Sequence, residues 1–328
     1  MTLLSHGGAP PGGKEEPVLS PPGNDANAKR ERRQIFWTRL DLKVSPYLFI
    51  SPFFILFAIF GLFPLVYTVW VSLHDWTLLG GNQGFVGLDN YVRLVQDGKF
   101  WNSLYNTFGI FVIAVVPQLL LAMYLADTLS RKVRAVNFFR MGLLLPYLTS
   151  VAAVAIVFSQ LFGTQFGLIN YALGFFGIDP INWQGGTFSS WVAIAVMVDW
   201  RWTGYNALIY LAAMSAIPRD IYEAASIDGA SRTRQFWQIT VPMLRPTIIF
   251  TVIVSTIGQM QLFTEPVIFG GVAGGTQGQF QTTMMLIFEE AFRFNNYGYG
   301  SAIAWTLFML VVVLSALNAL LSSRIKGA

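Results

Sequence analysis

The chain has 328 residues, of which 54% are hydrophobic and only 12% are charged. Ordinary soluble domains carry about twice that share of charge, so most of this chain must meet lipid. Cysteine is absent, which excludes a disulfide framework, a thiolate metal site and a cysteine nucleophile. The sequence therefore predicts an all-α, polytopic membrane protein.

The first 43 residues differ in composition from the rest. They are rich in Pro, Gly, Asn and charge and lack a sustained apolar period, so we expect a disordered tail at 1–43. Residues 8–14 match the first seven letters of a phosphate-binding P-loop, but Glu15 stands where Ser or Thr is needed, and we attribute the match to chance. The first apolar run is too late and too long for a cleavable signal peptide.

Six apolar segments follow, each long enough to cross a hydrocarbon core of about 30 Å as a helix. They comprise residues 47–73, 104–126, 141–162, 189–214, 247–269 and 301–322. They define a membrane domain at 44–324, followed by a short C-terminal end at 325–328. Between them, Asp89 to Phe100 has the character of a short amphipathic helix, and 166–177 that of a re-entrant or surface helix.

The basic residues set the orientation. Seventeen Lys and Arg residues fall in the tail, the C-terminal end and the loops 127–140 and 215–246, against three in the opposite loops. The positive-inside rule therefore places both termini and the loop 215–246 in the cytoplasm. This topology accounts for the net charge of +4, and no nucleic-acid partner is needed to explain it.

A charged stretch at 217–246 separates the fourth and fifth apolar segments. It has the pattern of two short helices joined at Gly229, with Pro218 before the first. Gly229 permits a turn that other residues resist, and Pro242 and Pro246 mark the return to an apolar run. A compact, charged helical segment within a membrane domain is typical of a docking surface for a partner outside the membrane.

The spacing in this stretch resembles the EAA loop of ABC importer permeases. Glu223-Ala224-Ala225 is followed at the EAA distances by Gly229, Ile239 and Pro242. Asp228-Gly229-Ala230 and the run 239–246 are similar to the sugar-importing, maltose-type branch, although Val241 replaces the usual Leu. The resemblance covers about residues 44–324.

The resemblance implies a type I ABC importer permease with six transmembrane helices in a bacterial or archaeal inner membrane. Its partners would be a second homologous permease, two ATPase subunits that bind ATP and Mg, an extracytoplasmic solute-binding protein and membrane lipid. It implies no cofactor in this chain. The residues that would couple to the ATPase are Glu223, Ala224, Ala225, Asp228, Gly229, Ile239 and Pro242.

Polar residues inside membrane segments are costly and tend to face a bundle interior or a watery cavity. Amides, carboxylates and tryptophans suit a sugar, since they bond its hydroxyls and cover its apolar ring face. The substrate-pathway candidates are Trp200, Trp202, Asn206, Gln259, Gln261 and Glu265. Asp199 and Arg201 lie two residues apart on a helix, so their side chains diverge, and we favour a structural role for both.

Nothing in the sequence indicates catalysis. His6 lies in the tail, and His74 beside Asp75 has no nucleophile near it. No metal-ligand spacing is present, so we expect no catalytic or metal site.

Other functions remain open at this stage. They are an ABC permease for glycerol phosphate, an amino acid or an anion, an ATP-independent secondary transporter, and a membrane enzyme such as a glycosyl transferase. The sequence does not name the sugar.

Overall fold

The computed structural model describes residues 25–130 and 135–325. The expectations for residues 1–24, among them the P-loop match, lie outside the described residues. Contacts divide the chain into two units, Met1–Leu65 and Val66–Ala328. The first unit contains helix α1 (Asp25–Phe57), the π-helical turn η1 (Ala58–Leu62) and the start of α2 (Phe63–Ser72).

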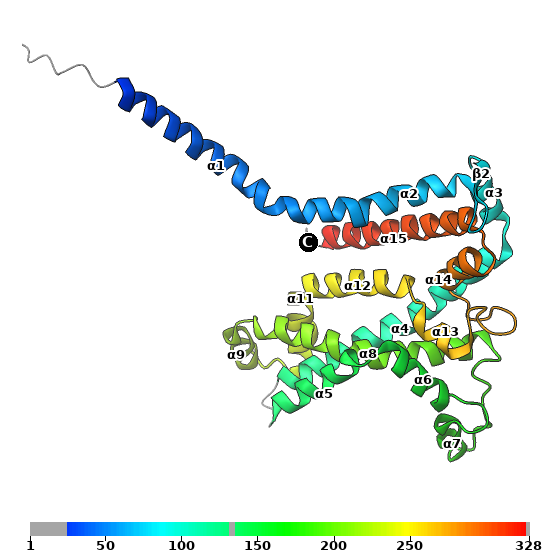
Figure 1. Ribbon diagram of the computed structural model, residues 1–328. Coiled ribbons are helices and arrows are strands. Elements are labelled where there is room, and N and C mark those ends of the chain that lie inside the picture. Colours follow the sequence, from blue (N-terminus) through cyan, green and yellow to red (C-terminus); the bar gives the residue numbers. More distant parts are fainter. Residues whose placement is uncertain (1–24, 131–134, 326–328) are drawn as a thin grey trace, which may run out of the picture. The chain divides into compact units, whose positions relative to one another are not determined.

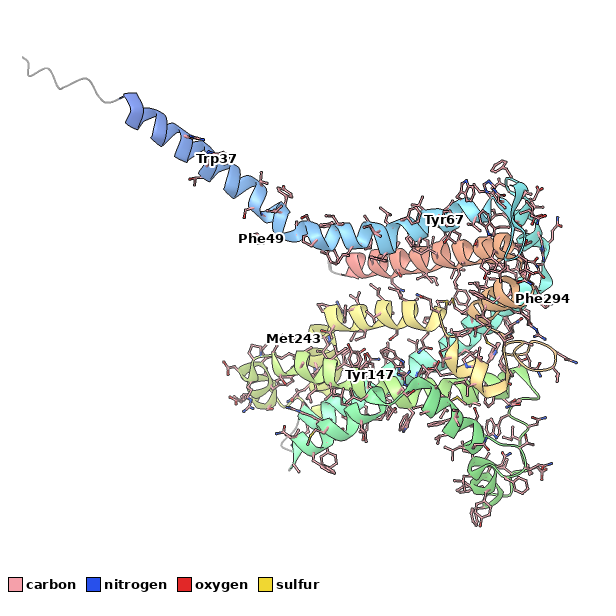
Figure 2. All side chains as sticks on the ribbon, in the orientation of Figure 1. Trp37, Phe49, Tyr67, Tyr147, Met243 and Phe294 are labelled. Carbon is pink, nitrogen blue, oxygen red and sulfur yellow. The ribbon has the colours of Figure 1, made fainter. Side chains whose placement is uncertain are left out.

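Residues 25–43, which we expected to be disordered, are helical in α1. Composition indicated a polar segment, but its residues are good helix formers. Residues 26–43 include four Arg, two Lys, two Ala and two Leu and no Gly or Pro, and a helix already present at residue 44 extends through such residues at little cost. Trp37 and Phe49 project from α1 with 55% and 81% of their surface exposed (Figure 2).

The second unit is almost entirely helical (Figure 1). Its first part contains β1 (His74–Thr77), β2 (Gly81–Phe85), α3 (Asp89–Gln96), α4 (Gly98–Ser130), α5 (Val136–Leu148), α6 (Val151–Leu161), α7 (Leu168–Gly174) and α8 (Thr187–Ser215). Its second part contains α9 (Arg219–Ile227), α10 (Arg232–Gln235), η2 (Phe236–Thr240), α11 (Val241–Met243), α12 (Arg245–Met260), α13 (Thr264–Gly270), α14 (Thr283–Phe288), η3 (Glu289–Arg293) and α15 (Tyr297–Ile325).

The antiparallel hairpin β1–β2 was not expected from the sequence. A backbone bridge between Thr77 and Asn296 fixes it beside the start of α15. The side chain of Asn90 donates to the carbonyl oxygens of Ser72 (2.9 Å) and His74 (3.1 Å), so the hairpin is tied to α3 as well. His74 also bonds the carbonyl of Trp70 through Nδ1 (2.7 Å), which gives this histidine a structural place.

Within the described residues, three helices are long and apolar enough to cross a membrane, or up to five if each bent pair is one span. The three are Val44–Ser72, Gly98–Ser130 and Tyr297–Leu320. The fourth expected segment is α8, which carries Asp199 and Arg201 and falls outside this set. Its 29 residues would nevertheless extend about 44 Å at roughly 1.5 Å each. The count of six spans therefore stays a prediction.

Two expected spans are not continuous helices. The segment 141–162 comprises α5 and α6, which meet at an angle of 91°. Thr149 adopts an extended backbone there, and its hydroxyl donates to the carbonyl of Pro146, which satisfies a helix-end acceptor. The segment 247–269 also breaks. Helix α12 ends at Met260, and the Gln261 and Leu262 amides donate to carbonyls of its last turn.

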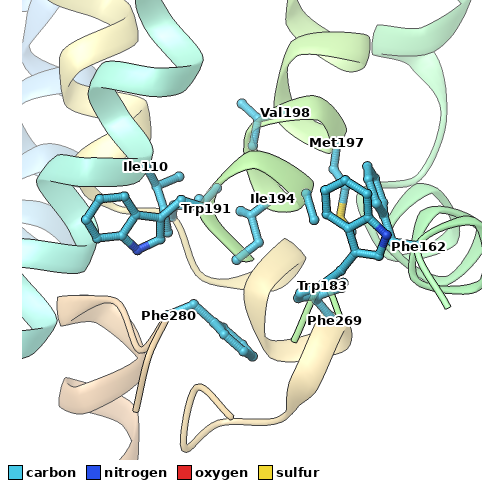
Figure 3. Close-up of a cluster of buried hydrophobic side chains, with 11 residues drawn as sticks. Ile110, Phe162, Trp183, Trp191, Ile194, Met197, Val198, Phe269 and Phe280 are labelled. Carbon is cyan, nitrogen blue, oxygen red and sulfur yellow. The ribbon is translucent and has the colours of Figure 1, made fainter. Parts of the chain in front are cut away.

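Helix α4 packs along α8, and theirs is the most extensive contact between two elements of this unit. A buried apolar cluster links this pair to α6 and α13 and includes Ile110, Phe162, Trp183, Trp191, Phe269 and Phe280 (Figure 3). Gly204 allows α5 to pack closely on α8, because a Cβ at this position would overlap the Leu143 carbonyl. The core thus holds α8 between α4 and α5.

Candidate coupling loop and membrane cavity

The loop between α8 and α12 consists of two short helical arms. Helix α9 forms the first arm, and α10, η2 and α11 form the second. They join at Gly229, which has a φ of +77°, and the Ala230 amide donates to the Ala225 carbonyl (2.9 Å) across the turn. Ser231 begins the second arm, with its hydroxyl accepting a bond from the Arg234 amide. The structure thus has two helices joined at Gly229, as the sequence predicted.

Side-chain hydrogen bonds brace the two arms against each other. The Gln235 amide nitrogen donates to the Ser226 hydroxyl (2.9 Å) and to the Ala230 carbonyl (3.1 Å). The hydroxyls of Tyr222 and Thr240 also bond each other (2.9 Å). Sequence reasoning missed these residues, because Gln235 and Ser226 lie 9 positions apart and Tyr222 and Thr240 lie 18 apart. The bonds fix the angle between the arms.

The loop presents a mixed charged and apolar surface. Among the expected coupling residues, Glu223, Ala224, Asp228 and Gly229 are exposed, whereas Ala225, Ile239 and Pro242 are half-buried. Two large apolar side chains that sequence reasoning did not include are also exposed, Ile227 by 87% and Trp237 by 58%. The loop therefore offers both charged and apolar side chains to solvent.

A cavity of about 270 Å³ lies among α8, α12 and α13, with contributions from α4 and α6. Five of the six pathway candidates line it, namely Trp202, Asn206, Gln259, Gln261 and Glu265. Trp200 does not line it. Its side chain is 43% exposed and packs on Phe158 of α6, with ring centroids 5.6 Å apart, because residues two apart on a helix point in different directions.

Three buried carboxamides at the cavity carry atoms without hydrogen-bond partners among the described residues. Gln118 is 1% exposed and lacks partners at both its amide nitrogen and oxygen. Asn206 lacks one at Nδ2, and Gln259 lacks one at Oε1. Buried polar groups are nearly always bonded to protein or to ordered water. These carboxamides are therefore suited to water or to a polar ligand in the cavity.

Gln118 was missed by sequence reasoning. It is buried within α4, in the second apolar segment, whereas all the substrate-pathway candidates come from the fourth and fifth segments. The available signal was an amide near the middle of a long apolar helix, directly after Pro117. Gln261 lines the cavity too, but its amide donates to the Ile257 carbonyl of its own helix (3.0 Å).

One ion pair lies in the cavity wall. Nη1 of Arg201 on α8 is 3.4 Å from Oε1 of Glu265 on α13, and the two side chains are 13% and 6% exposed. Arg201 is therefore paired with a residue of another helix. Asp199 does not line the cavity, and its Oδ1 is buried without a partner within the described part of the chain.

Aromatic rings border the same cavity. Tyr205 and Trp202 line it, and Tyr147 of α5 stacks on Tyr205 with centroids 4.5 Å apart. Trp202 meets both tyrosines edge-on. Across residues 25–130 and 135–325, no group of three or more His, Cys, Asp or Glu residues is placed to hold a metal ion.

The helical membrane domain, its polar cavity and the projecting helical loop together define a membrane transport subunit. The model of the family described as "Binding-protein-dependent transport system inner membrane component" matches residues 118–327. The chain belongs to this family. It is therefore a multi-pass permease of a binding-protein-dependent transport system, which is a transport component and not an enzyme, and the resemblance seen in the EAA spacing is confirmed.

Individual relatives agree with the family match. The chain is 38% identical to the lactose transport system permease protein LacF of Rhizobium radiobacter over 84% of its own length and 93% of the relative's. It is 33% identical to the arabinooligosaccharides permease AraP of Bacillus subtilis (90% and 93% covered). It is 32% identical to the trehalose/maltose permease MalF of Thermococcus litoralis (81% and 89% covered).

A solved structure has the same fold. A chain of a bacterial ABC transporter involved in import of the acidic polysaccharide alginate superimposes with a TM-score of 0.72 and 19% identity, covering 88% of this chain and 99% of that one. The predicted helical importer-permease architecture is therefore confirmed, with the β1–β2 hairpin as an addition to it.

Proposed function

We propose that this chain is the permease subunit through which a sugar, delivered by an extracytoplasmic binding protein, enters a bacterial or archaeal cell. The observation that carries this proposal is the cavity, where Gln118, Asn206 and Gln259 hold buried carboxamide atoms with no partner among the described residues. A sugar hydroxyl both donates and accepts, as a carboxamide does, so each side can satisfy the other.

The aromatic rings support the same substrate class. A sugar ring has an apolar C–H face as well as hydroxyls, and Tyr205 and Trp202 offer it apolar ring surface beside the amides. The relatives' names point the same way, since they specify lactose, arabinooligosaccharides, and trehalose or maltose. The sugar differs from one relative's name to the next, so the names support sugars as the substrate class but no particular sugar.

Energy is proposed to come from partner subunits. The two braced arms would dock into two ATPase subunits that bind ATP and Mg, with Glu223 pairing a basic group and Ile227 filling an apolar hollow. A loop whose arms are tied by Gln235 and Tyr222 transmits motion as a unit, which favours an ATP-driven importer over a secondary transporter. The loop and both termini would be cytoplasmic, and a second, similar permease would complete the pathway in the inner membrane.

An anionic solute such as glycerol phosphate is the second candidate. It would need a cation in the pathway, and Arg201 lines the cavity. However, this guanidinium is already paired with Glu265 at 3.4 Å, which disfavours the anion.

Reconstitution tests the proposal. The chain is purified with its second permease, ATPase and binding protein, and uptake of labelled lactose, maltose, trehalose and arabinotriose is measured in proteoliposomes. We expect ATP-dependent uptake of at least one of these sugars, which Gln259→Leu reduces and the control Trp200→Leu, outside the cavity, does not. Uptake without ATP, or equal loss in both variants, would refute the proposal.

A further inference from the structure

The cavity contains two formally charged side chains, and they neutralise each other. Every other side chain of its lining is apolar, aromatic, hydroxyl or carboxamide. Arg201 and Glu265 pair across it from α8 and α13. We infer that Glu265 determines specificity, because its carboxylate cancels the Arg201 charge and so reserves the cavity for uncharged sugars over acidic ones. This inference rests on the proposed sugar pathway.

The burial of the pair makes its charge balance important. Both side chains are at least 87% buried, and water screens charge poorly in such surroundings. A cation left alone there would be strongly unfavourable unless an anion joined it. Arg201 also keeps Nε buried and without a partner in the described residues, so a donor is free for a ligand. Glu265 therefore occupies the place that an anionic sugar would take.

The remaining polar groups disfavour an acidic ligand as well. Gln118 and Gln259 each leave a carbonyl oxygen without a partner, and Gln118 Nε2 and Asn206 Nδ2 are donors without one among the described residues, so the ligand must both donate and accept. A hydroxymethyl group does both, whereas a carboxylate only accepts and leaves the two carbonyl oxygens unpaired. A site built to bond a hydroxyl rejects an analogue that leaves buried polar groups unpaired. The ion pair and the carboxamides thus select the same class of sugar.

Glucose and glucuronate are suitable probes, since they differ at C6 alone. Binding of each is measured by equilibrium dialysis on the complete permease–ATPase complex in nanodiscs, without the binding protein, whose own selectivity would mask the effect. We expect wild type to prefer glucose by roughly tenfold or more. Glu265→Gln should lower glucose affinity and raise glucuronate affinity, which reverses the preference. Glu265→Asp keeps the charge and should keep the preference.

The double variant Arg201→Gln/Glu265→Gln separates selectivity from structure. It removes both charges, so it should again prefer glucose. If Glu265→Gln loses both sugars equally, or gains no glucuronate, the pair is structural only and the inference is wrong. Should that variant not assemble, the double variant decides, since loss of its glucose preference overturns the inference. If wild type transports neutral sugars but shows no preference, this inference alone fails. If it neither binds nor transports sugar, the proposed function fails too.

Discussion

The coupling loop and the membrane cavity are built in opposite ways. The loop comes from one continuous stretch, residues 217–246, and its polar side chains bond one another across the Gly229 turn. The cavity is lined by residues of five helices, which are spread along the sequence from Gln118 to Glu265. Several of its buried polar atoms have no partner among the described residues. Satisfied bonds make a segment rigid, whereas unsatisfied ones leave affinity for a ligand. A lever needs the first property and a binding site the second.

The loop and the cavity also differ in how far their side chains are exposed to solvent. The loop displays Glu223 and Ile227 to solvent, so substitutions there act on a partner more than on the fold. Gln118 is 1% exposed, so substitutions in the cavity act on both stability and ligand. Paired measurements of stability and transport therefore distinguish the two regions.

The largest effect is expected from Glu223→Lys. Reversing this exposed charge should repel the basic group proposed on the ATPase, so the ATPase should no longer co-purify and uptake should fall to background. The thermal midpoint of the isolated permease should not change, because the side chain is exposed. Asp179→Lys, an exposed carboxylate away from the loop, serves as the control. Retained uptake by Glu223→Lys would contradict the docking role.

Gln118→Leu should separate stability from function. Removing two unpartnered buried polar atoms should raise the free energy of unfolding by about 1–3 kcal/mol, while uptake falls by roughly tenfold because a ligand contact is lost. Thermal unfolding and proteoliposome uptake measure the two quantities.

Asn106→Leu is the matched control, because Asn106 is a buried carboxamide on the same helix as Gln118 but has hydrogen-bond partners. Asn106 is 0% exposed, but its amide donates to the Gly278 (2.8 Å) and Gln281 (3.1 Å) carbonyls and accepts from Trp191 Nε1 (3.1 Å). Its loss should lower stability by about 2–3 kcal/mol. If Gln118→Leu is destabilising as well, the cavity amide is not poised for a ligand.

Gln235→Ala tests whether the loop is a rigid lever. Losing the bonds to Ser226 of the first arm and to Ala230 of the turn should leave ATPase docking intact but reduce sugar transported per ATP hydrolysed by a few-fold, since about 1–2 kcal/mol of bracing is removed. The ratio is measured with ATPase and uptake assays on one preparation. Gln238→Ala, an exposed glutamine bonded to Arg234 within the second arm, is the control. An unchanged ratio would show that the brace is dispensable.

Tyr222→Phe should give the smallest effect. It removes one hydroxyl and its bond to Thr240, worth about 0.5–1.5 kcal/mol, while the ring keeps its place. We expect less than a twofold fall in sugar transported per ATP. A fall as large as that of Gln235→Ala would place the main brace at Tyr222.

Much of this protein is determined by local sequence. Composition and apolar length predict a helical membrane domain, because every backbone group in lipid must bond within its own segment. The coupling loop is predictable because its features also depend on residues that are close in sequence. Gly229 and its flanking helix formers act over a few residues. Helix propensity also explains α1 at residues 25–43, where composition alone was misleading.

Other features depend on contacts between distant segments, and only the tertiary structure decides them. The hairpin at 74–85 is held by Asn90 and Asn296, and the bend after Leu148 and the break after Met260 interrupt segments that are each long enough in sequence to be one helix. Trp200 and Trp202 are equivalent by composition, yet helix rotation directs only one to the cavity. The fold also brings Arg201 beside Glu265 and leaves Gln118 buried without a partner in the described residues. Sequence does not reveal this, because the energy of a buried polar group depends on which neighbours lie within bonding distance.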